Sequence, residues 1–159
     1  MSPVKPIPDG YPRVTPYLCV DDAAKAIEFY KEALGAEERM RMDGPDGRIG
    51  HAELAIGDSV IMLADEYPDV GALSAKTVGG TPVSIHVYVE DVDDTFARAV
   101  KAGAKELRPV EDQFYGERTG WLEDPFGHRW SVASHVEDVS PEEMQERMAA
   151  AFAKEAGSG

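Results

Sequence analysis

His51 and Glu53 stand two positions apart in the apolar stretch Gly50-His-Ala-Glu-Leu-Ala-Ile56. In a β-strand, side chains two positions apart point to the same face, so we expect this imidazole and carboxylate to lie side by side. A second histidine, His86, stands in another alternating stretch. Two imidazoles and a carboxylate suit iron, zinc or manganese, so these residues would form a metal site if they meet. The alternative is a polar strand face whose groups hydrogen-bond to their neighbours.

A second group of candidates surrounds the segment Glu111-Asp-Gln-Phe-Tyr-Gly-Glu117, which is predicted to be a loop between two strands. Gln113 and Tyr115 belong to this loop, and Arg118 and Trp121 follow it. An amide, aromatic rings and a guanidinium together suit a flat or anionic small molecule. The alternative is a loop anchored by its rings, with the arginine paired to an acid. The predicted ligand-binding set is His51, Glu53, His86, Gln113, Tyr115, Arg118 and Trp121.

The elements that must position these residues follow one order twice. Laid on each other without a gap, the two halves place Gly50 on Gly120, Glu53 on Glu123 and Gly57 on Gly127. Hydrophobic periodicity predicts strand, helix and three further strands in each half. The first half has strands at 14–20, 37–42, 48–56 and 59–64 and a helix from 22 to 34; the second has strands at 83–89, 105–110, 118–123 and 128–134 and a helix from 91 to 102.

This pattern predicts an α+β fold, in which two βαβββ modules form one curved eight-stranded sheet with outer helices. The ligand pocket is expected in the concave face of the paired modules. Residues 1–12 are predicted to be an extended tail, and residues 13–136 one domain made of module one (13–65), a linker (66–80) and module two (81–136). An amphipathic helix and a flexible end are predicted at 137–159, with Met144, Met148 and Phe152 along one side of the helix.

Composition narrows the classes of partner. The chain has 159 residues and a formal charge of −14, from 16 basic and 30 acidic residues. Such a chain repels phosphate backbones and anionic lipid, so neither a nucleic acid nor a membrane is expected as a partner. A single cysteine, Cys19, fits a reducing compartment. The start of the sequence does not resemble a signal peptide, and we expect a cytoplasmic protein.

Several motifs resemble those of one known family. They are Asp22…Ala26-Ile-Glu-Phe-Tyr30…Leu34-Gly35, Gly50-His-Ala-Glu53, Asp112-Gln-Phe-Tyr-Gly116 and Asp124-Pro-Phe-Gly-His-Arg-Trp130. Together with the paired βαβββ modules, they resemble the vicinal oxygen chelate superfamily, which includes glyoxalase I, bleomycin-resistance proteins, fosfomycin-resistance enzymes and extradiol dioxygenases. Over residues 13–136 the chain is most similar to a bacterial branch of glyoxalase/bleomycin-resistance-like proteins.

The resemblance also implies where a metal would be held. Metal enzymes of this superfamily use a His, Gln or Glu of the first strand and a Glu of the last strand in each module. In module one these positions fall on Tyr17 (or Pro16) and on Ile61 or Met62; in module two they fall on His86 and Ser131. Only His86 matches, and a catalytic divalent ion needs three or more protein donors. We therefore expect no cofactor.

Two hypotheses about function follow. The favoured one is a metal-independent protein of the glyoxalase/bleomycin-resistance type that binds a small molecule, aromatic or cationic, and forms a homodimer. The alternative is a metal-dependent lyase, isomerase or dioxygenase that holds a divalent metal at a rearranged site of His51, Glu53 and His86. A third possibility is a domain whose cavity is filled by its own side chains.

Overall fold

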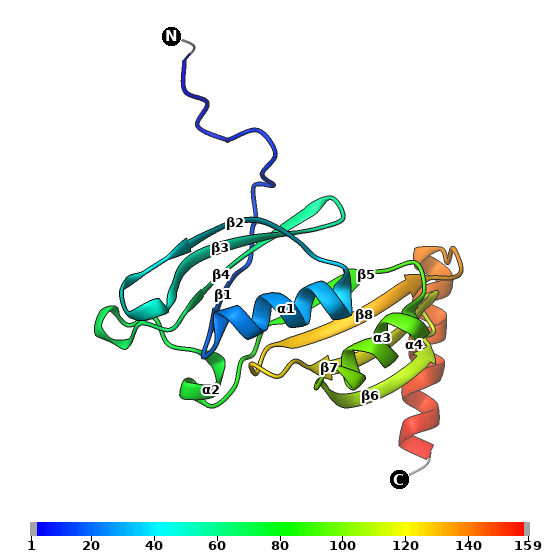
Figure 1. Cartoon of the computed structure of the whole chain (residues 1–159). Coiled ribbons are helices and arrows are strands. Elements are labelled where there is room, and N and C mark those ends of the chain that lie inside the picture. Colours follow the sequence, from blue (N-terminus) through cyan, green and yellow to red (C-terminus); the bar gives the residue numbers. More distant parts are fainter. Residues whose placement is uncertain (1–2, 158–159) are drawn as a thin grey trace. The chain divides into compact units, whose positions relative to one another are not determined.

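The computed structural model describes residues 3–157 of the chain (Figure 1). The first two residues of the predicted tail and the last two of the predicted flexible end lie outside this range. Gly157, the last residue described, is also the last residue of a helix. The chain divides into two compact units. Unit one comprises the residues up to Pro82 together with Pro125–His128, and unit two comprises Val83–Asp124 together with the residues from Arg129 onward.

Unit one has a four-stranded sheet in the order β1-β4-β3-β2, with β1 and β4 parallel and the other neighbours antiparallel. Two short 3-10 turns, at Pro45–Gly47 and Pro68–Val70, and the short helix α2 (Ala75–Val78) lie in its connections. The main elements are β1 (Tyr17–Val20), α1 (Ala23–Leu34), β2 (Glu37–Asp43), β3 (Ile49–Ile56) and β4 (Ser59–Asp65).

Helix α1 begins and ends where its sequence predicts. The Asp22 carboxylate accepts a hydrogen bond from the backbone N–H of Lys25, which satisfies a free donor of the first turn. Gly35 ends the helix in the left-handed conformation, at φ 68°, where a side chain would be strained. Between these ends α1 lies against one face of the sheet, along β2, β3 and β4 (Figure 1). Its residues Ile27 and Tyr30 are buried. We call the side of each sheet on which its helix lies the helix face.

The segment Pro125–His128 completes the core of unit one, although it lies between two strands of unit two in the sequence. The Phe126 ring lies 6.2 Å from that of Phe29, and their edge-to-face arrangement is a favourable one for aromatic rings. His128 Nε2 lies 3.0 Å from the carbonyl oxygen of Cys19. The boundary between the units therefore crosses the predicted module two.

Unit two repeats the topology with a second four-stranded sheet, in the order β5-β8-β7-β6. Asp91 caps α3 as Asp22 caps α1. Helix α3 lies on the helix face of this sheet, against β6, β7 and β8. The elements are β5 (Ser84–Tyr88), α3 (Val92–Lys101), β6 (Lys105–Asp112), β7 (Glu117–Glu123), β8 (Arg129–His135) and α4 (Pro141–Gly157).

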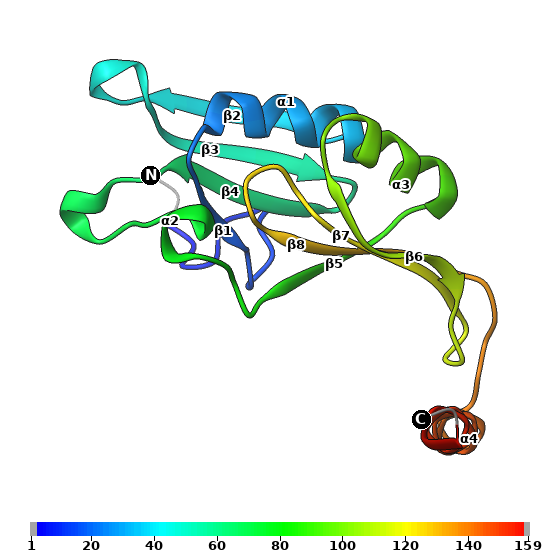
Figure 2. The same ribbon diagram turned by 90° about the horizontal axis from the view of Figure 1, so that it is seen from below.

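Helix α4 is the predicted amphipathic helix, and none of its residues is buried. Figure 2 shows it, viewed along its axis, at the end of the extended segment that follows β8. Arg147 anchors it, with hydrogen bonds to the Glu137 carboxylate at 2.6 Å and to the carbonyl oxygen of Phe114 at 3.1 Å. Met148 and Phe152 remain exposed, Phe152 with 64% of its surface accessible.

The prediction of paired βαβββ modules is confirmed, but the prediction of one eight-stranded sheet is wrong. The structure has two four-stranded sheets. A continuous sheet requires edge strands of the two modules to exchange backbone hydrogen bonds. Within residues 3–157, β1 pairs with β4 and β5 pairs with β8, and no ladder joins one sheet to the other. The repeated sequence pattern predicts strands within each module and carries no information about pairing between modules.

The pairing registers also correct the alignment of the two halves. Tyr17 lies opposite Met62 and His86 lies opposite Ser131. On the other side of Met62 stands Glu53, whereas on the other side of Ser131 stands Trp121. Glu53 therefore corresponds to Trp121 and not to Glu123. The gapless alignment is wrong here because the connection between β7 and β8 is longer than the turn between β3 and β4.

Candidate functional site

The face of the unit-one sheet opposite α1 carries a continuous chain of hydrogen bonds. The Tyr11 hydroxyl donates to Glu53 Oε1 at 2.5 Å. The second carboxylate oxygen, Oε2, lies 2.8 Å from His51 Nε2. At the far side of the imidazole, Nδ1 lies 2.9 Å from the Tyr17 hydroxyl. Strand β3 provides the histidine and the carboxylate on one face, as their spacing predicts, while β1 and the segment before it provide the two phenols.

The carboxylate at the centre of this chain is buried, with Glu53 only 5% exposed. The hydrogen bonds from His51 and then from Tyr11 lower the pKa of Glu53, although burial opposes this effect. The same contact raises the pKa of Tyr11, because loss of its proton would place two anions side by side. Arg39 lies over the Tyr11 ring, 4.5 Å from its centroid, and also donates to the carbonyl oxygen of Gly10. Glu53 is therefore ionised although it is almost completely shielded from solvent.

An ionised Glu53 determines the tautomer of His51. A carboxylate only accepts hydrogen bonds, so the imidazole must present Nε2–H to it. In the neutral ring Nδ1 is then an acceptor, and the Tyr17 hydroxyl donates to it. Partial burial raises the pKa of Tyr17, so this phenol keeps its proton. Tyr17 is 54% exposed and forms the accessible end of the chain.

The corresponding face of unit two carries a different arrangement. His86 Nδ1 lies 2.5 Å from Ser131 Oγ, and His86 Nε2 lies 3.4 Å from Glu117 Oε2. The Tyr88 hydroxyl donates directly to Glu117 Oε1 at 2.5 Å, which raises the pKa of Tyr88. Thr119 lies on the same face of β7, and its buried hydroxyl is without a hydrogen-bond partner among the described residues.

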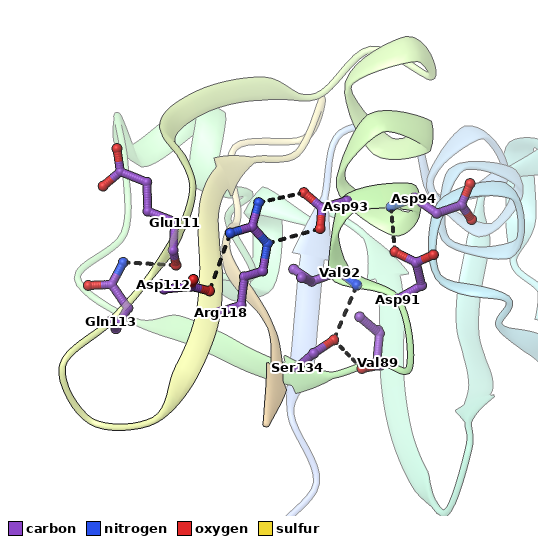
Figure 3. A network of polar contacts seen from close by, with 10 residues as sticks. All are labelled: Val89, Asp91, Val92, Asp93, Asp94, Glu111, Asp112, Gln113, Arg118 and Ser134. Atoms are coloured by element: carbon purple, nitrogen blue, oxygen red, sulfur yellow. Dashed lines mark hydrogen bonds and ion pairs between the residues drawn. The ribbon is translucent and has the colours of Figure 1, made fainter. Parts of the chain in front are cut away.

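Arg118 is engaged on the opposite side of that sheet (Figure 3). Its guanidinium forms a two-pronged pair with Asp93, at 2.9 and 3.0 Å, and a further contact with Asp112 at 3.3 Å. These bonds raise the pKa of Arg118 and lower that of Asp93. Asp93 lies in the first turn of α3, so Arg118 ties β7 to the helix face and points away from the face that carries Trp121.

Gln113 and Tyr115 lie in the connection between β6 and β7, as predicted. The Gln113 backbone N–H donates to the carbonyl oxygen of Glu117 at 2.7 Å. The Gln113 side-chain amide donates to the carbonyl oxygen of Glu111 (Figure 3). The Tyr115 ring packs edge-on against Phe114, with centroids 5.1 Å apart. These contacts shape the loop, and a ligand role for either side chain stays a prediction.

The structure thus brings together only some of the predicted ligand-binding residues. His51 and Glu53 bond to each other, and His86 and Trp121 lie on either side of Ser131. Arg118 is on the other face of the β7 sheet. Tyr11, Tyr88 and Glu117 are not among the predicted residues; Tyr11 is remote in sequence from Glu53 and has no periodic signal. Alternation along β5 places Tyr88 beside His86 and provided a signal for that residue.

The positions at which the superfamily holds a metal are occupied by a poor donor set. The pairs across the parallel strands are Tyr17 with Met62 and His86 with Ser131. Of these four side chains only the His86 imidazole is a donor of the nitrogen or carboxylate type that divalent ions prefer; a phenol, a thioether and a hydroxyl are not. Among residues 3–157, no group of three or more His, Cys, Asp or Glu is arranged to hold a metal ion. These residues do not fit the metal of the family.

Comparison with known proteins defines the class. The model of the Glyoxalase/Bleomycin resistance protein/Dioxygenase superfamily matches residues 11–132, and the chain belongs to this family, the vicinal oxygen chelate superfamily. An uncharacterised protein of Mycobacterium tuberculosis (strain ATCC 25618 / H37Rv) is 45% identical over 140 residues, which cover 86% of this chain and 82% of that protein. A lactoylglutathione lyase of Neisseria meningitidis serogroup B is 26% identical over 113 residues, covering 70% of this chain and 82% of the lyase.

Solved structures show the same fold. TioX from Micromonospora sp. ML1 superposes with a TM-score of 0.62 at 28% identity, over 79% of this chain and 99% of that one. The fosfomycin resistance protein FosX from Listeria monocytogenes, solved with Mn(II) and sulfate, gives a TM-score of 0.61 over 86% of this chain and 97% of its own. At 18% identity the second likeness concerns the fold alone. No helix within residues 3–157 is long and apolar enough to span a membrane.

Proposed function

We propose that this protein binds a small aromatic or cationic molecule without a metal, on a sheet face opposite a helix. The observation that carries the proposal is the state of the donors in unit one. Both oxygens of the Glu53 carboxylate and both ring nitrogens of His51 have protein partners. A group must give up such partners before it can coordinate an ion, and a buried polar group left without one costs about 1–3 kcal/mol. This opposes the rearranged metal site.

Aromatic surface and charge support the class of ligand. Tyr17 and Trp121 lie on the faces opposite the helices and offer rings for stacking. The formal charge of −14 favours cationic over anionic ligands at long range. We propose a small molecule as the partner, with no role for a nucleic acid or a membrane.

A thermal-shift screen against aromatic and cationic compounds, run with and without a strong chelator, tests this function. Ligand at about one hundred times its Kd stabilises a protein by about 2.7 kcal/mol, which is readily seen as a rise in Tm. We expect at least one compound class to raise the Tm equally with and without the chelator. A rise that the chelator abolishes would contradict metal independence.

One finding favours a second candidate, a metal-dependent lyase. The relative from Neisseria meningitidis is a lactoylglutathione lyase, at 26% identity over 113 residues. Under this alternative a divalent metal would be held by His51, Glu53 and His86. Metal-dependent turnover that is lost in His86→Ala would establish it, and unchanged stability of His86→Ala with no bound metal would remove it.

We also propose that the protein forms a homodimer. The support is α4, in which no residue is buried and which leaves Met148 and Phe152 exposed. Exposed apolar surface of this kind commonly marks an interface. Sedimentation of the full chain is expected to give twice the mass of one chain, and a single-chain mass at micromolar concentration would contradict the proposal.

A cytoplasmic location is proposed from the only cysteine. Cys19 is a free thiol whose pKa is raised by partial burial, so the thiol keeps its proton and reacts slowly. Such a residue suits a reducing compartment. Fractionation of the native host is expected to recover the protein with cytoplasmic markers, and recovery with exported proteins would contradict this.

A further inference from the structure

We propose that Tyr17, His51 and Glu53 form a proton-accepting site that binds a weakly acidic hydroxyl compound, a phenol or an enol, as its anion. The inference rests on the proposed function and deepens it, because it narrows the aromatic ligand to one that carries an ionisable hydroxyl. Tyr17 contacts the ligand, His51 accepts the proton, and Glu53 acts as a positioning residue.

The order of the groups gives the direction of proton movement. Glu53 is buried and takes hydrogen bonds at both oxygens, from Tyr11 and from His51. Its bond to Nε2 leaves His51 Nδ1 as the only ring atom able to gain a proton. That atom lies 2.9 Å from the Tyr17 hydroxyl. The imidazole therefore reaches the accessible side of the protein through Tyr17.

Tyr17 serves as a relay because its oxygen both donates and accepts. Its O–H donates to His51, and its lone pairs can accept a hydrogen bond from a ligand hydroxyl. On transfer, the ligand O–H bond breaks and its proton joins the Tyr17 oxygen, while the original Tyr17 proton moves to His51 Nδ1. The ligand becomes an anion, Tyr17 remains a neutral phenol, and His51 becomes an imidazolium. No metal, oxidant or second reactant is needed for this balance.

The charge created in this step is compensated locally. The imidazolium lies 2.8 Å from the Glu53 carboxylate, and this pair is neutral as a whole. Arg39 adds a positive charge over the Tyr11 ring, on the far side of Glu53. The net charge of −14 opposes an anion, but exposed charges beyond about 8–10 Å are largely screened at physiological salt. The charges of His51, Glu53 and Arg39 therefore influence the bound anion more than the exposed acids that make up the net charge.

Unit two lacks this arrangement, which is why the site is assigned to unit one. Its exposed phenol, Tyr88, donates directly to the Glu117 carboxylate, so no imidazole accepts from it. The imidazole of His86 instead places Nδ1 against Ser131, which is only 1% exposed. A ligand at Tyr88 would meet a phenol whose proton is held by an anion.

The test uses 4-nitrophenol, whose anion alone absorbs strongly in the visible range. The full chain is titrated with it at a pH equal to the pKa of the free compound, where half of the compound is neutral. We expect the visible band to rise on binding, because retaining the anion lowers the ligand pKa; one unit corresponds to about a tenfold change in the ratio of anion to neutral form. Nitrogen-15 NMR of the four histidines, recorded before and after addition of the compound, should show an imidazolium signal from His51 that grows with the visible band.

Matched variants separate the relay from simple binding. Tyr17→Phe and His51→Gln should both lose the visible band; in His51→Gln the glutamine amide can still donate to Glu53 but cannot hold a proton. Tyr67→Phe removes another half-exposed phenol of unit one and should leave the band unchanged. 4-Nitroanisole, which has no acidic proton, should bind to the native chain and to Tyr67→Phe without producing the band.

The outcomes distinguish this inference from the proposed function. If both compounds bind and no anion forms, the relay is overturned and binding of an aromatic molecule stands. If the band survives in His51→Gln, the proton goes elsewhere and the inference is wrong. If neither compound binds at millimolar concentration while a cationic compound raises the Tm, the ligand class is wrong and the proposed function stands.

Discussion

Units one and two share the order of their strands and helices, yet the polar groups on the faces opposite the helices differ. In unit one a histidine stands between an exposed phenol and a buried carboxylate, and every polar atom of the His51 and Glu53 side chains is bonded. In unit two the phenol bonds the carboxylate directly and the Thr119 hydroxyl is buried without a partner among residues 3–157. The duplication therefore fixes the backbone pairing and leaves the side-chain chemistry of these faces free to diverge.

The helix faces show the same principle in packing. Ile27 of α1 and Phe96 of α3 each lie five residues after the capping aspartate. In the registers of the two sheets, Ala52 of unit one corresponds to Gly120 of unit two. A β-carbon at Gly120 would lie 2.7 Å from the Phe96 ring. In unit two the larger Phe96 thus packs against Gly120, whereas in unit one the smaller Ile27 corresponds to it and Ala52 replaces the glycine. The sum of the two side-chain volumes is therefore more similar between the units than either side chain alone, as close packing requires.

The largest difference is expected from removal of the two carboxylates. Glu53→Ala leaves Tyr11 and His51 facing a buried gap, and we expect a loss of about 3 kcal/mol in the free energy of unfolding. Glu117→Ala affects groups nearer to solvent, since the His86 side chain is 38% exposed, and should cost about 1 kcal/mol. Urea denaturation of both variants measures the difference. Equal losses would show that the two faces are energetically alike.

A second difference is expected at two glycines that the gapless alignment treats as equivalent. Gly120→Ala forces a β-carbon against Phe96 and Val110 and should cost about 2 kcal/mol. Gly50→Ala places its β-carbon 3.7 Å from the nearest atom, an ordinary contact, and serves as the control with little change. The thermal midpoints of the two variants provide the measurement. An unchanged thermal midpoint for Gly120→Ala would mean that the helix face of unit two can accommodate the additional methyl group.

A stabilising change is expected at Thr119. Its hydroxyl is buried and no described residue bonds it, so Thr119→Val removes an unsatisfied group and keeps the shape of the side chain. We expect a gain of up to about 1 kcal/mol. Thr95→Val, at another buried threonine, is the comparison, because the Thr95 hydroxyl accepts from Arg98 at 3.5 Å. Loss of stability in Thr119→Val would indicate a partner that this face acquires in solution.

The smallest effect is the pH dependence that Glu53 contributes. Its pKa is lowered in the folded protein by His51 and Tyr11. A lowered carboxyl pKa contributes stability that is complete above the unfolded value, about 4.3, and is lost as the pH falls through the folded value. The native chain should therefore lose more unfolding free energy than Glu53→Gln between about pH 6 and pH 3.5. If the unfolding free energies of the two proteins fall in parallel over this pH range, Glu53 does not have a lowered pKa in the folded protein.

Much of this fold follows from the sequence alone. Capping aspartates and alternating apolar residues predict the strands and helices, and the helix limits at Asp22 and Gly35 agree with the structure. The spacing of His51 and Glu53 correctly predicts a shared face, because side-chain direction in a strand depends only on parity. Strand pairing across modules and the offset between the halves depend on loop lengths and edge contacts, which local patterns do not encode.

The candidate site was less accessible to prediction. Tyr11 stands in a segment without regular secondary structure, and only folding brings it to Glu53, 42 residues away. Arg118 belongs to the predicted ligand-binding set, with pairing to an acid as the alternative, and in the structure it pairs with Asp93 of α3 and Asp112 of β6. Such contacts depend on tertiary packing. In a chain with many acidic residues, the sequence therefore does not indicate which of them will pair with a given arginine.

The metal content of protein purified without a chelator tests the central claim most directly. We expect less than about a tenth of an equivalent of any transition metal, because the donors of His51 and Glu53 are bonded within unit one. Of the four family positions only one carries a histidine, His86; the others carry Tyr17, Met62 and Ser131. Close to one equivalent of iron, zinc or manganese, lost together in His51→Ala and His86→Ala, would contradict the claim.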